Sequence, residues 1–376
     1  MITKYDEMFC HQAVSTFDRP GTSAREWTER AWITIYAIAG GGHLAAGFGY
    51  YPNRNIMDAF VCFTVRDKTH YIVRASRELR PDIDVFKVGP FSYEVVEPLK
   101  KVRFRLDENE YGLSYDIEIE GVSPLHEEEP AQLQISRGRV KEHIKRMVQS
   151  GRPSGWIKAE RETFQIDKES WVGLRDRSWG VRLAGADFAE SGVQPPEIYD
   201  GQLFNFVLMQ FKTWGAGFHI REIWDDKLGA VRTWHFGGGL FYPYGTGKEE
   251  VELVSVEHHH EFNDDRPEQQ RRFAGGRVIL NAIDGTTREV SIRPLTICYQ
   301  APGGYGGYYK GFIHGLWMGP FWIDGYKLDV TDAEVMREIW GYVDYGSEFR
   351  CGDEVGYGTT ELMVVGKYPG YGYQGY

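Results

Sequence analysis

One short segment combines three charged side chains with a serine, a tryptophan and a glycine. Residues 175–180 read Arg-Asp-Arg-Ser-Trp-Gly and lie in a region rich in predicted strands. Because an unpaired charge is costly to bury, we expect Asp176 to be held ionised or oriented by Arg175 or Arg177. One interpretation places this pair at the mouth of a cavity. The alternative is an exposed ion-pair corner with Trp179 packed beneath it.

Two further side chains, Glu361 and His219, have the chemistry of proton carriers. Tyr357 and Glu361 are four positions apart, so both face the same side of a strand. A carboxyl group in an aromatic-lined pocket has a raised pKa that suits a general acid, and pairing of Glu361 with an arginine is the structural alternative. His219 has an imidazole that titrates near neutral pH, although a histidine on a half-buried strand is more often a hydrogen-bonded core residue.

A run of three histidines between two glutamates is the most obvious metal-binding pattern. Residues 257–261 read Glu-His-His-His-Glu, and on a strand His258 and His260 would share one face. Two such histidines with a carboxylate could bind a divalent metal. The run continues into a charged loop at 263–267 and specifies no third ligand, which favours a polar strand end. We predict no metal and no cofactor, since no phosphate loop, dinucleotide fingerprint or nucleophile elbow is present.

The composition narrows the protein class. Of 376 residues, 15% are aromatic and 42% hydrophobic, which is enough apolar material for a folded core and excludes a disordered chain. The 45 glycines follow no collagen repeat. The net charge of −11 argues against a nucleic-acid partner, because such a protein needs a basic face for phosphates.

The elements that must position these side chains are mainly short strands. Apolar runs at 32–38 and 44–51 flank Gly40-Gly41-Gly42 and predict a hairpin, and residues 113–119 alternate apolar and acidic side chains as a half-buried strand does. Helical patterns are confined to 140–148 and 333–340. The sequence therefore predicts a mostly antiparallel β-protein.

The chain length predicts two domains of about 150–200 residues. A segment at 184–200 with Gly192, Pro195 and Pro196 is the best place for the chain to cross between them. We expect a domain at 1–190 that ends in the charged motif and a second domain at 191–376 with an aromatic, glycine-rich tail.

The charged motif resembles the signature of a known superfamily. Residues 173–182 (GLRDRSWGVR) are similar to the Gly-x-Arg-Asp-(His/Arg)-Ser-Trp-Gly-x-Arg pattern of the hydroxyneurosporene synthase and carotenoid 1,2-hydratase-like proteins, which include fungal decalin-forming Diels–Alderases. Residues 43–58 and 350–366 resemble two segments of a bacterial branch of that group. The resemblance implies two lipocalin-like antiparallel β-barrel or sandwich domains side by side, with ligands in a barrel mouth or at the domain interface.

These observations favour a cofactor-independent enzyme of the hydratase, lyase or isomerase type that acts on a hydrophobic aromatic or isoprenoid-like molecule. Proton transfer would fall to Asp176, His219 or Glu361, with Arg175 orienting a carboxylate. The side chains expected to bind the substrate in an aromatic-walled cavity are Tyr50, Arg177, Trp179, Trp214, Trp234, Tyr309, Trp317 and Tyr357.

Two other functions fit the same sequence. A lipocalin-type carrier would have a deep apolar pocket without converging acid and base groups. A partner-binding module would use the tail at 366–376, and a homodimer is possible. Four scattered cysteines without zinc spacing, a polar segment at 1–12 and the lack of a long apolar run predict a cytoplasmic protein without membrane insertion.

Overall fold

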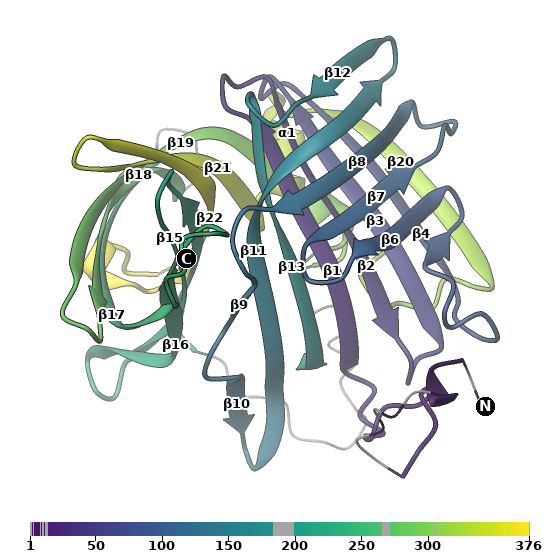
Figure 1. The fold of residues 1–376 in the computed structure, drawn as a ribbon, viewed down its shortest axis with the longest axis horizontal. Coiled ribbons are helices and arrows are strands. Elements are labelled where there is room, and N and C mark those ends of the chain that lie inside the picture. The colour runs from purple at the N-terminus through teal and green to yellow at the C-terminus, as the bar shows by residue number, and fades with distance from the viewer. Residues whose placement is uncertain are drawn as a thin grey trace.

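Residues 2, 4–7, 9, 11, 14–182, 199–264, 271–305 and 307–375 are described by the computed structural model of the protein. Strands account for 62% of it and helices for 5%. Two antiparallel β-structures lie side by side: a curled, half-barrel sheet and a closed barrel (Figure 1). This arrangement confirms the predicted fold class.

The half-barrel sheet is built mainly from the N-terminal half of the chain. Its strands are β1 (Trp27–Ala37), β2 (Gly42–Tyr51), β3 (Ile56–Val65), β4 (Thr69–Glu78), β5 (Lys87–Val88), β6 (Phe91–Glu97), β7 (Lys101–Leu106), β8 (Leu113–Gly121), β9 (His126–Glu127), β10 (Gln132–Ser136), β11 (Arg139–Ala159), β12 (Glu162–Ile166), β13 (Trp171–Arg182) and β20 (Phe321–Asp329). They follow the order β20-β4-β3-β2-β1-β13-β11-β8-β7-β6-β5, with β9, β10 and β12 also paired to β11. One edge strand, β20, comes from the C-terminal half.

The barrel is closed by consecutive strands of the C-terminal half. It consists of β14 (Gly201–Gln210), β15 (Gly215–Asp225), β16 (Ala230–Phe241), β17 (Val251–Asn263), β18 (Arg272–Ala282), β19 (Thr287–Tyr299), β21 (Val343–Cys351) and β22 (Glu354–Gly366). The predicted domain boundary at 190/191 falls within 183–198, outside the described residues.

The helical elements are short. Helix α1 spans Ala333–Ile339, and the Asp332 side chain accepts the Glu334 N–H as its N-cap, which confirms the helix predicted from 333. Within the described residues, 3₁₀ turns span Lys4–Glu7, Ala301–Gly303 and Pro369–Tyr371.

The helix predicted at 140–148 is wrong, because these residues belong to β11. Ile144, Arg146 and Val148 are buried, whereas the intervening Lys145 and Met147 are half-buried. This alternation is the period of a strand, and pairing with β13 on one side and with β10 and β9 on the other supplies the backbone hydrogen bonds of this part of β11. Because the segment carries charged residues on both faces of the strand, its sequence lacks the strict alternation of apolar and polar residues that indicates a strand. The spacing of its apolar residues was therefore interpreted as helical.

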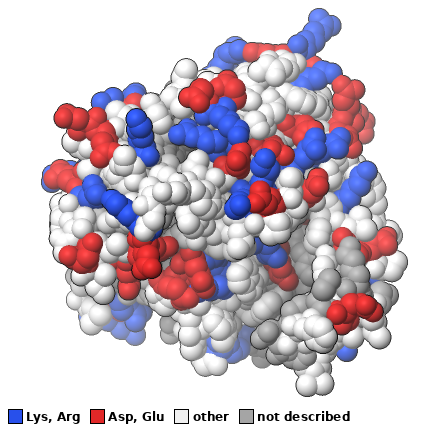
Figure 2. Space-filling model, viewed as in Figure 1, with Lys and Arg blue, Asp and Glu red and all other residues white. Residues whose placement is uncertain are grey.

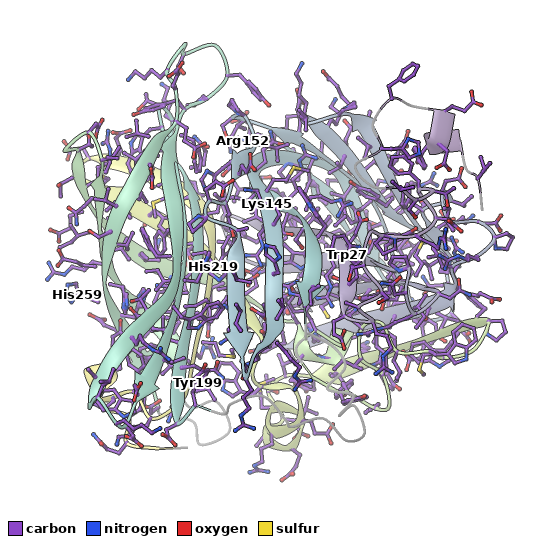
Figure 3. The ribbon with its side chains drawn as sticks, turned by 90° about the horizontal axis from the view of Figure 1, so that it is seen from below. Trp27, Lys145, Arg152, Tyr199, His219 and His259 are labelled. Carbon is purple, nitrogen blue, oxygen red and sulfur yellow. The ribbon has the colours of Figure 1, made fainter. Side chains whose placement is uncertain are left out.

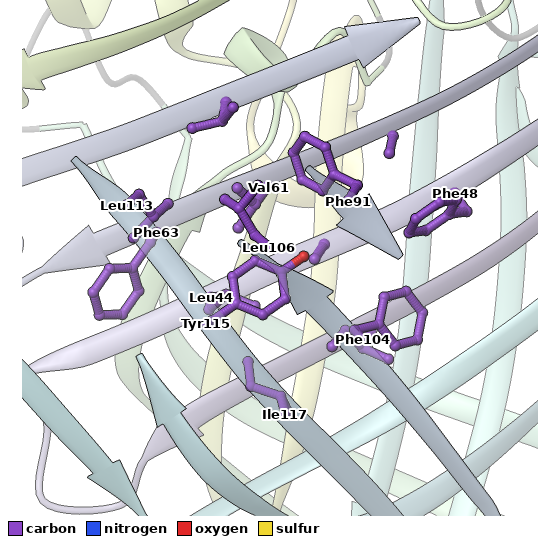
Figure 4. Packing of buried hydrophobic residues seen from close by; sticks show 14 of the residues in the cluster. Leu44, Phe48, Val61, Phe63, Phe91, Phe104, Leu106, Leu113, Tyr115 and Ile117 are labelled. Atoms are coloured by element: carbon purple, nitrogen blue, oxygen red, sulfur yellow. The ribbon is translucent and has the colours of Figure 1, made fainter. Parts of the chain in front are cut away.

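Three apolar clusters hold the structure together. One fills the half-barrel, where Phe63 and Phe91 pack with Tyr115 (Figure 4). A second fills the closed barrel. The third lies between the two and includes Trp32 and Phe206. Because both faces of the central strands of the first sheet are covered, all ten residues of β3 are buried, and such strands read as continuous apolar runs.

Buried polar contacts fix how the barrel sits on the half-barrel sheet. The Asp344 carboxylate on β21 accepts a hydrogen bond from Thr34 and lies 3.1 Å from His43 Nε2. The Tyr36 hydroxyl donates to the Ser347 carbonyl oxygen at 2.8 Å. All of these groups are buried, so a shift between the two bodies would leave several of them without partners.

The aromatic tail docks on its own barrel. The Tyr371 hydroxyl lies 2.5 Å from His258 Nδ1, and its ring packs at 5.1 Å from that of Phe262. Tyr368 stacks on Tyr371 and pairs with Tyr373 through backbone hydrogen bonds. The tail therefore packs against β17 in cis.

The outer surface carries charges of both signs. Figure 2 shows acidic and basic side chains beside one another over the face that is also seen in Figure 1. On that face the acidic groups therefore alternate with basic ones and form no large patch of a single sign.

The glycine of the charged motif has a testable structural role. Gly180 has φ +136°, and an added Cβ would lie 2.0 Å from the His143 carbonyl oxygen on β11. We expect Gly180→Ala to lower the free energy of unfolding by about 2–4 kcal/mol, because the backbone is strained and the strands are forced apart. Urea unfolding measures the change. Gly307→Ala is the control, since a Cβ there meets nothing within 4 Å; equal stability of the two variants would contradict this role.

Candidate functional site

The side chains of the charged motif lie alternately on the two faces of strand β13. On β13, Arg177 and Trp179 line a large cavity inside the half-barrel, whereas Asp176 lines a pocket that faces the barrel. The alternation of side chains along a strand produces this division. Neighbouring Arg175 and Arg177 therefore do not pair with Asp176, and its cation comes from another strand.

The first pocket, here named the interface pocket, lies between the two β-structures and has a volume of about 50 Å³. This volume holds a few water molecules or a small polar group. It contains Asp176 of the half-barrel sheet and Glu361 of the barrel, so the fold brings together two of the three predicted proton carriers. Its lining is Arg30, Trp32, Glu142, Arg146, Asp176, Arg182, Phe204, Phe206, Arg221, Tyr305, Tyr342 and Glu361.

Arg146 is the cation that pairs with Asp176. Its Nε lies 2.9 Å from the Asp176 carboxylate, and its Nη1 lies 3.4 Å from Glu128. Burial raises the pKa of Asp176, and Arg146 offsets only part of this effect. Burial would also raise the pKa of Glu128, but the Arg146 guanidinium outweighs it and holds that pKa well below its usual range.

Glu361 is a protonated acid in the same pocket. Burial raises its pKa to about 8, and the buried carboxylate of Asp344, its cross-strand neighbour on β21, adds to the shift. Arg146 acts in the opposite direction without cancelling it. At neutral pH the pocket therefore contains one carboxyl group that holds a proton and one carboxylate paired with a guanidinium, which is the arrangement that separates acid from base.

His219 lies behind this pocket and does not line it. It is fully buried on β15, at the junction where the barrel faces Lys145 of β11 in Figure 3. Its Nδ1 is 3.3 Å from Arg146 Nη1 and 3.5 Å from Glu128. Burial holds the pKa of His219 well below its ordinary value, so the imidazole is neutral and Nδ1 accepts from Arg146. The hydrogen bond from Arg146 to His219 helps to hold the guanidinium in place. Proton transfer by His219 itself stays a prediction.

One group of described residues has the donor set of a metal site. The side chains of Glu128, His219 and His235 offer ligand atoms within 4.8 Å of one another, and two histidines with one carboxylate suit several divalent metals. The Arg146 guanidinium contacts Glu128 and His219 and supplies positive charge there. A cation could enter only if Arg146 moved away.

The histidine run of β17 is engaged in contacts of another kind. His258 and His260 share one face, with rings 5.4 Å apart. His258 contacts Glu222 at 3.3 Å on one side and the tail residue Tyr371 on the other, while His260 Nε2 lies 2.8 Å from Asn205 Nδ2. These histidines connect the tail to the barrel.

The second pocket, here named the main cavity, has a volume of about 820 Å³ and opens in the half-barrel near β1 and the segment before it. Three of the predicted binding residues line it. Burial raises the pKa of Tyr50 to about 12, with Glu29 adding to the shift, and Glu29 forms an ion pair with Arg177. Its wall is rich in aromatic side chains: Tyr5, Phe17, Trp27 (labelled in Figure 3), Phe48, Tyr50, Phe86, Tyr93 and Trp179.

Arg175 was predicted to orient a carboxylate and Trp234 to bind the substrate, but neither lines the main cavity or the interface pocket. Arg175 is buried, and its Nε donates to Gln149 Oε1 at 2.7 Å. Burial lowers its pKa. Trp234 packs under the Arg221 guanidinium, 5.6 Å from its ring centre, and so supports a residue of the interface pocket from behind.

The remaining predicted binding residues line neither pocket. Trp214 stacks on Phe211 within the barrel core, and the Tyr309 carbonyl oxygen accepts from Arg74. Trp317 is 49% exposed, and Tyr357 is half-buried on β22. Aromatic content alone did not indicate which rings would meet in one cavity.

Most basic residues of the interface pocket were absent from the sequence interpretation. Arg146 was missed because its segment was read as a helix, whereas strand alternation places Glu142 and Arg146 on one face. Arg30 precedes a predicted strand at a position that no motif singles out, whereas Arg182 is the last residue of the motif at 173–182 and was given no role. A signal for them exists in the strand spacing. Trp32 and Asp176 are paired in register on β1 and β13, and charged residues an even number of positions away from either of them share its face of the sheet.

The family of the chain follows from its whole length. A family model described as "Family of unknown function (DUF8625)" matches residues 2–374. The chain belongs to this family. No curated protein shows significant sequence similarity to it.

Solved structures place this DUF8625 member within a known fold. A candidate AttH from Nitrosomonas europaea is similar at 13% identity over 90% of this chain and 92% of that chain, with a TM-score of 0.51. CghA, in a crystal structure with Sch210972, is similar at 10% identity over 91% of this chain and 89% of that chain, also with a TM-score of 0.51. Kievitone hydratase from Nectria haematococca has 11% identity and a TM-score of 0.41, over 92% of each chain. The likeness to candidate AttH and CghA shows that the chain shares their fold, which agrees with the fold expected from the resemblance at residues 173–182.

None of the helices in the described part of this family member is long and apolar enough to cross a membrane.

The raised pKa of Glu361 predicts a pH-dependent stability. The unfolded chain releases this proton near pH 4.5, whereas the folded protein keeps it to about pH 8. The contribution to stability is therefore fully present below pH 4.5 and is lost as the pH rises toward 8, by at most about 1.4 kcal/mol per pH unit. Glu361→Gln removes this loss. Urea midpoints of both proteins between about pH 5 and about pH 8 test it, and a constant difference between them would contradict a raised pKa.

Proposed function

We propose that this protein is an enzyme that uses acid–base chemistry, without a cofactor, on a hydrophobic small molecule in a hydration, elimination or isomerisation reaction. The observation that carries the proposal is that Glu361 and the Arg146-paired Asp176 line one pocket, where burial raises the pKa of Glu361 to about 8. Of two carboxyl groups with different protonation states at neutral pH, the protonated one can act as a general acid that donates a proton to a substrate, and the ionised one as a general base that accepts a proton.

In the hydration direction, Glu361 protonates one carbon of an alkene, and the electron-poor neighbouring carbon takes up a water molecule held in the interface pocket. A new C–O bond forms, and Asp176 accepts the proton that the water loses. The raised pKa of Asp176 makes it able to accept this proton, while Arg146 keeps it ionised before the reaction. Return of the proton from Asp176 to Glu361 resets the site, and the reverse sequence eliminates water.

The main cavity supplies the binding energy for an apolar substrate. Its volume of about 820 Å³ falls in the range of small-molecule sites, and its aromatic wall suits a ring system or an isoprenoid-like chain. Arg30 lines both the main cavity and the interface pocket.

The crystal structure of CghA with Sch210972 supports this proposal, because in CghA the same fold is found with a small organic molecule.

A carrier function is favoured by a different observation. The main cavity is large and largely aromatic, and the two carboxyl groups of the interface pocket do not line it. A carrier would bind a hydrophobic ligand there and return it unchanged.

Turnover in deuterated water separates the two functions. Isoprenoid and aromatic alkenes and their hydrated counterparts are screened for binding by native mass spectrometry, and bound compounds are then incubated with the protein in D₂O. For an enzyme we expect solvent-derived mass gain, with Glu361→Gln lowering kcat by about 10²–10⁴-fold at unchanged binding. Asp176→Asn should act in the same direction.

The matched control is Glu257→Gln, which removes an exposed glutamate from β17 and should leave turnover unchanged. Binding of the same compounds without deuterium uptake or product would contradict the enzyme and support the carrier. Equal turnover by the wild type and Glu361→Gln would show that Glu361 is not the acid.

A further inference from the structure

The main cavity has polar groups at the centre of its strand wall. Trp27 and Glu29 are two positions apart on β1, so both side chains face the cavity. In register, Glu29 lies opposite Tyr50 on β2 and opposite Trp179 on β13. Directly opposite residues of antiparallel strands have Cβ atoms about 4.5–5.5 Å apart, so the fold brings these groups together. We call Trp27, Glu29, Tyr50 and Arg177, which all line the cavity, the polar cluster.

The two charges of the polar cluster neutralise each other. Arg177 Nη2 forms an ion pair with Glu29 Oε2. Arg177 Nη1 donates to the Ser178 carbonyl oxygen at 2.8 Å, and the guanidinium lies 5.9 Å from the ring centre of Trp179. These contacts fix the guanidinium at the wall, where its positive charge is matched by one carboxylate.

The other charged residues at the cavity, within the described part of the chain, are also paired or directed away. Arg19 lies 3.9 Å from the Asp18 carboxylate, and His11 lies 3.0 Å from the Asp6 carboxylate. The Arg30 side chain belongs to the opposite face of β1, where it lines the interface pocket. A ligand with a net charge would therefore be buried in the main cavity without a free counter-charge, which is unfavourable.

The polar cluster has atoms that are left for a ligand. Trp27 Nε1 is buried without a hydrogen-bond partner among the described residues, and these residues also provide no partner for the Tyr50 hydroxyl or Glu29 Oε1. Burial and Glu29 raise the pKa of Tyr50 to about 12, so its hydroxyl keeps the proton and can donate. The cluster thus offers two donors and a carboxylate acceptor. A hydroxyl group is their complement, because it has two acceptor lone pairs and one O–H donor.

We propose that the main cavity binds a neutral amphipathic alcohol or phenol, whose hydroxyl group donates to Glu29 and accepts from Tyr50 and Trp27. A hydrocarbon in the same place would leave these atoms without partners, and a carboxylate would put a second negative charge beside Glu29. The volume of about 820 Å³ has room for a fused ring system as the apolar body. This inference rests on the proposed function in that both use the main cavity, and it adds the substrate class.

The test compares probes that share one ring system, naphthalene, 2-naphthol and 2-naphthoate, by equilibrium dialysis at neutral pH. We expect the wild type to bind 2-naphthol at least about 10-fold more tightly than naphthalene, because a hydrogen bond to a charged acceptor is stronger than one between neutral groups. We also expect 2-naphthol to bind at least about 10-fold more tightly than 2-naphthoate, since the carboxylate would lie beside Glu29.

Two variants assign these preferences to the polar cluster. Glu29→Gln keeps the size of the side chain but leaves Arg177 without its carboxylate, so the affinity ratio of 2-naphthol to 2-naphthoate should fall at least about 10-fold. Tyr50→Phe removes one donor and should lower the ratio of 2-naphthol to naphthalene about 3- to 10-fold. The control is Glu257→Gln, which changes an exposed glutamate of β17 and should keep both wild-type ratios.

The hydroxyl site would be overturned by equal wild-type affinities for 2-naphthol and naphthalene, by no binding of 2-naphthol, or by 2-naphthoate as the tightest ligand. Ratios that Glu29→Gln and Tyr50→Phe leave unchanged would overturn it as well. If one variant does not fold, the other variant and the wild-type ratios still decide. These affinities are measured without turnover, whereas the proposed function fails when Glu361→Gln leaves deuterium uptake unchanged, so the two failures are distinguishable.

Discussion

The ion pairs of Arg146 are the contact on which the arrangement of the two β-structures depends. Its guanidinium lies between Asp176 and Glu128 on the half-barrel sheet and contacts His219 on the barrel. Burial and the Asp344 carboxylate raise the pKa of a third carboxyl group nearby, Glu361, by more than Arg146 lowers it. One buried cation thus pairs with two acids, acts on the pKa of a third, and joins the surfaces that carry them.

The fold was largely predictable because the signals for it are local. Alternating apolar residues, glycine turns and the motif at 173–182 indicated two antiparallel β-domains of the lipocalin type. The error at 140–148 has a physical reason: β11 is paired on both sides and carries charged residues toward a buried interface, where strands seldom place them. Only the tertiary partner, Asp176, explains why Arg146 is buried there.

The site was predictable only in part, because it depends on contacts between residues far apart in the chain. Asp176 stood out as a charge that needed a partner, and Glu361 as an acid among aromatic residues; the structure places both in one pocket. Which arginine pairs with Asp176, and which of many aromatic rings line a cavity, depends on strand order and register. Trp179 and Trp214 look alike in sequence, yet one lines the main cavity and the other packs in the barrel core.

Strand β20 means that the two halves of the sequence are not two independent units. It pairs with β4 along its whole length, although more than two hundred residues separate them in the chain. During synthesis the half-barrel therefore has an open edge at β4 until residue 329 has emerged, and exposed strand edges promote aggregation. Strand β20 leaves the barrel segment between β19 and β21 to complete the neighbouring sheet, so evolution could exchange neither body alone without rebuilding that edge.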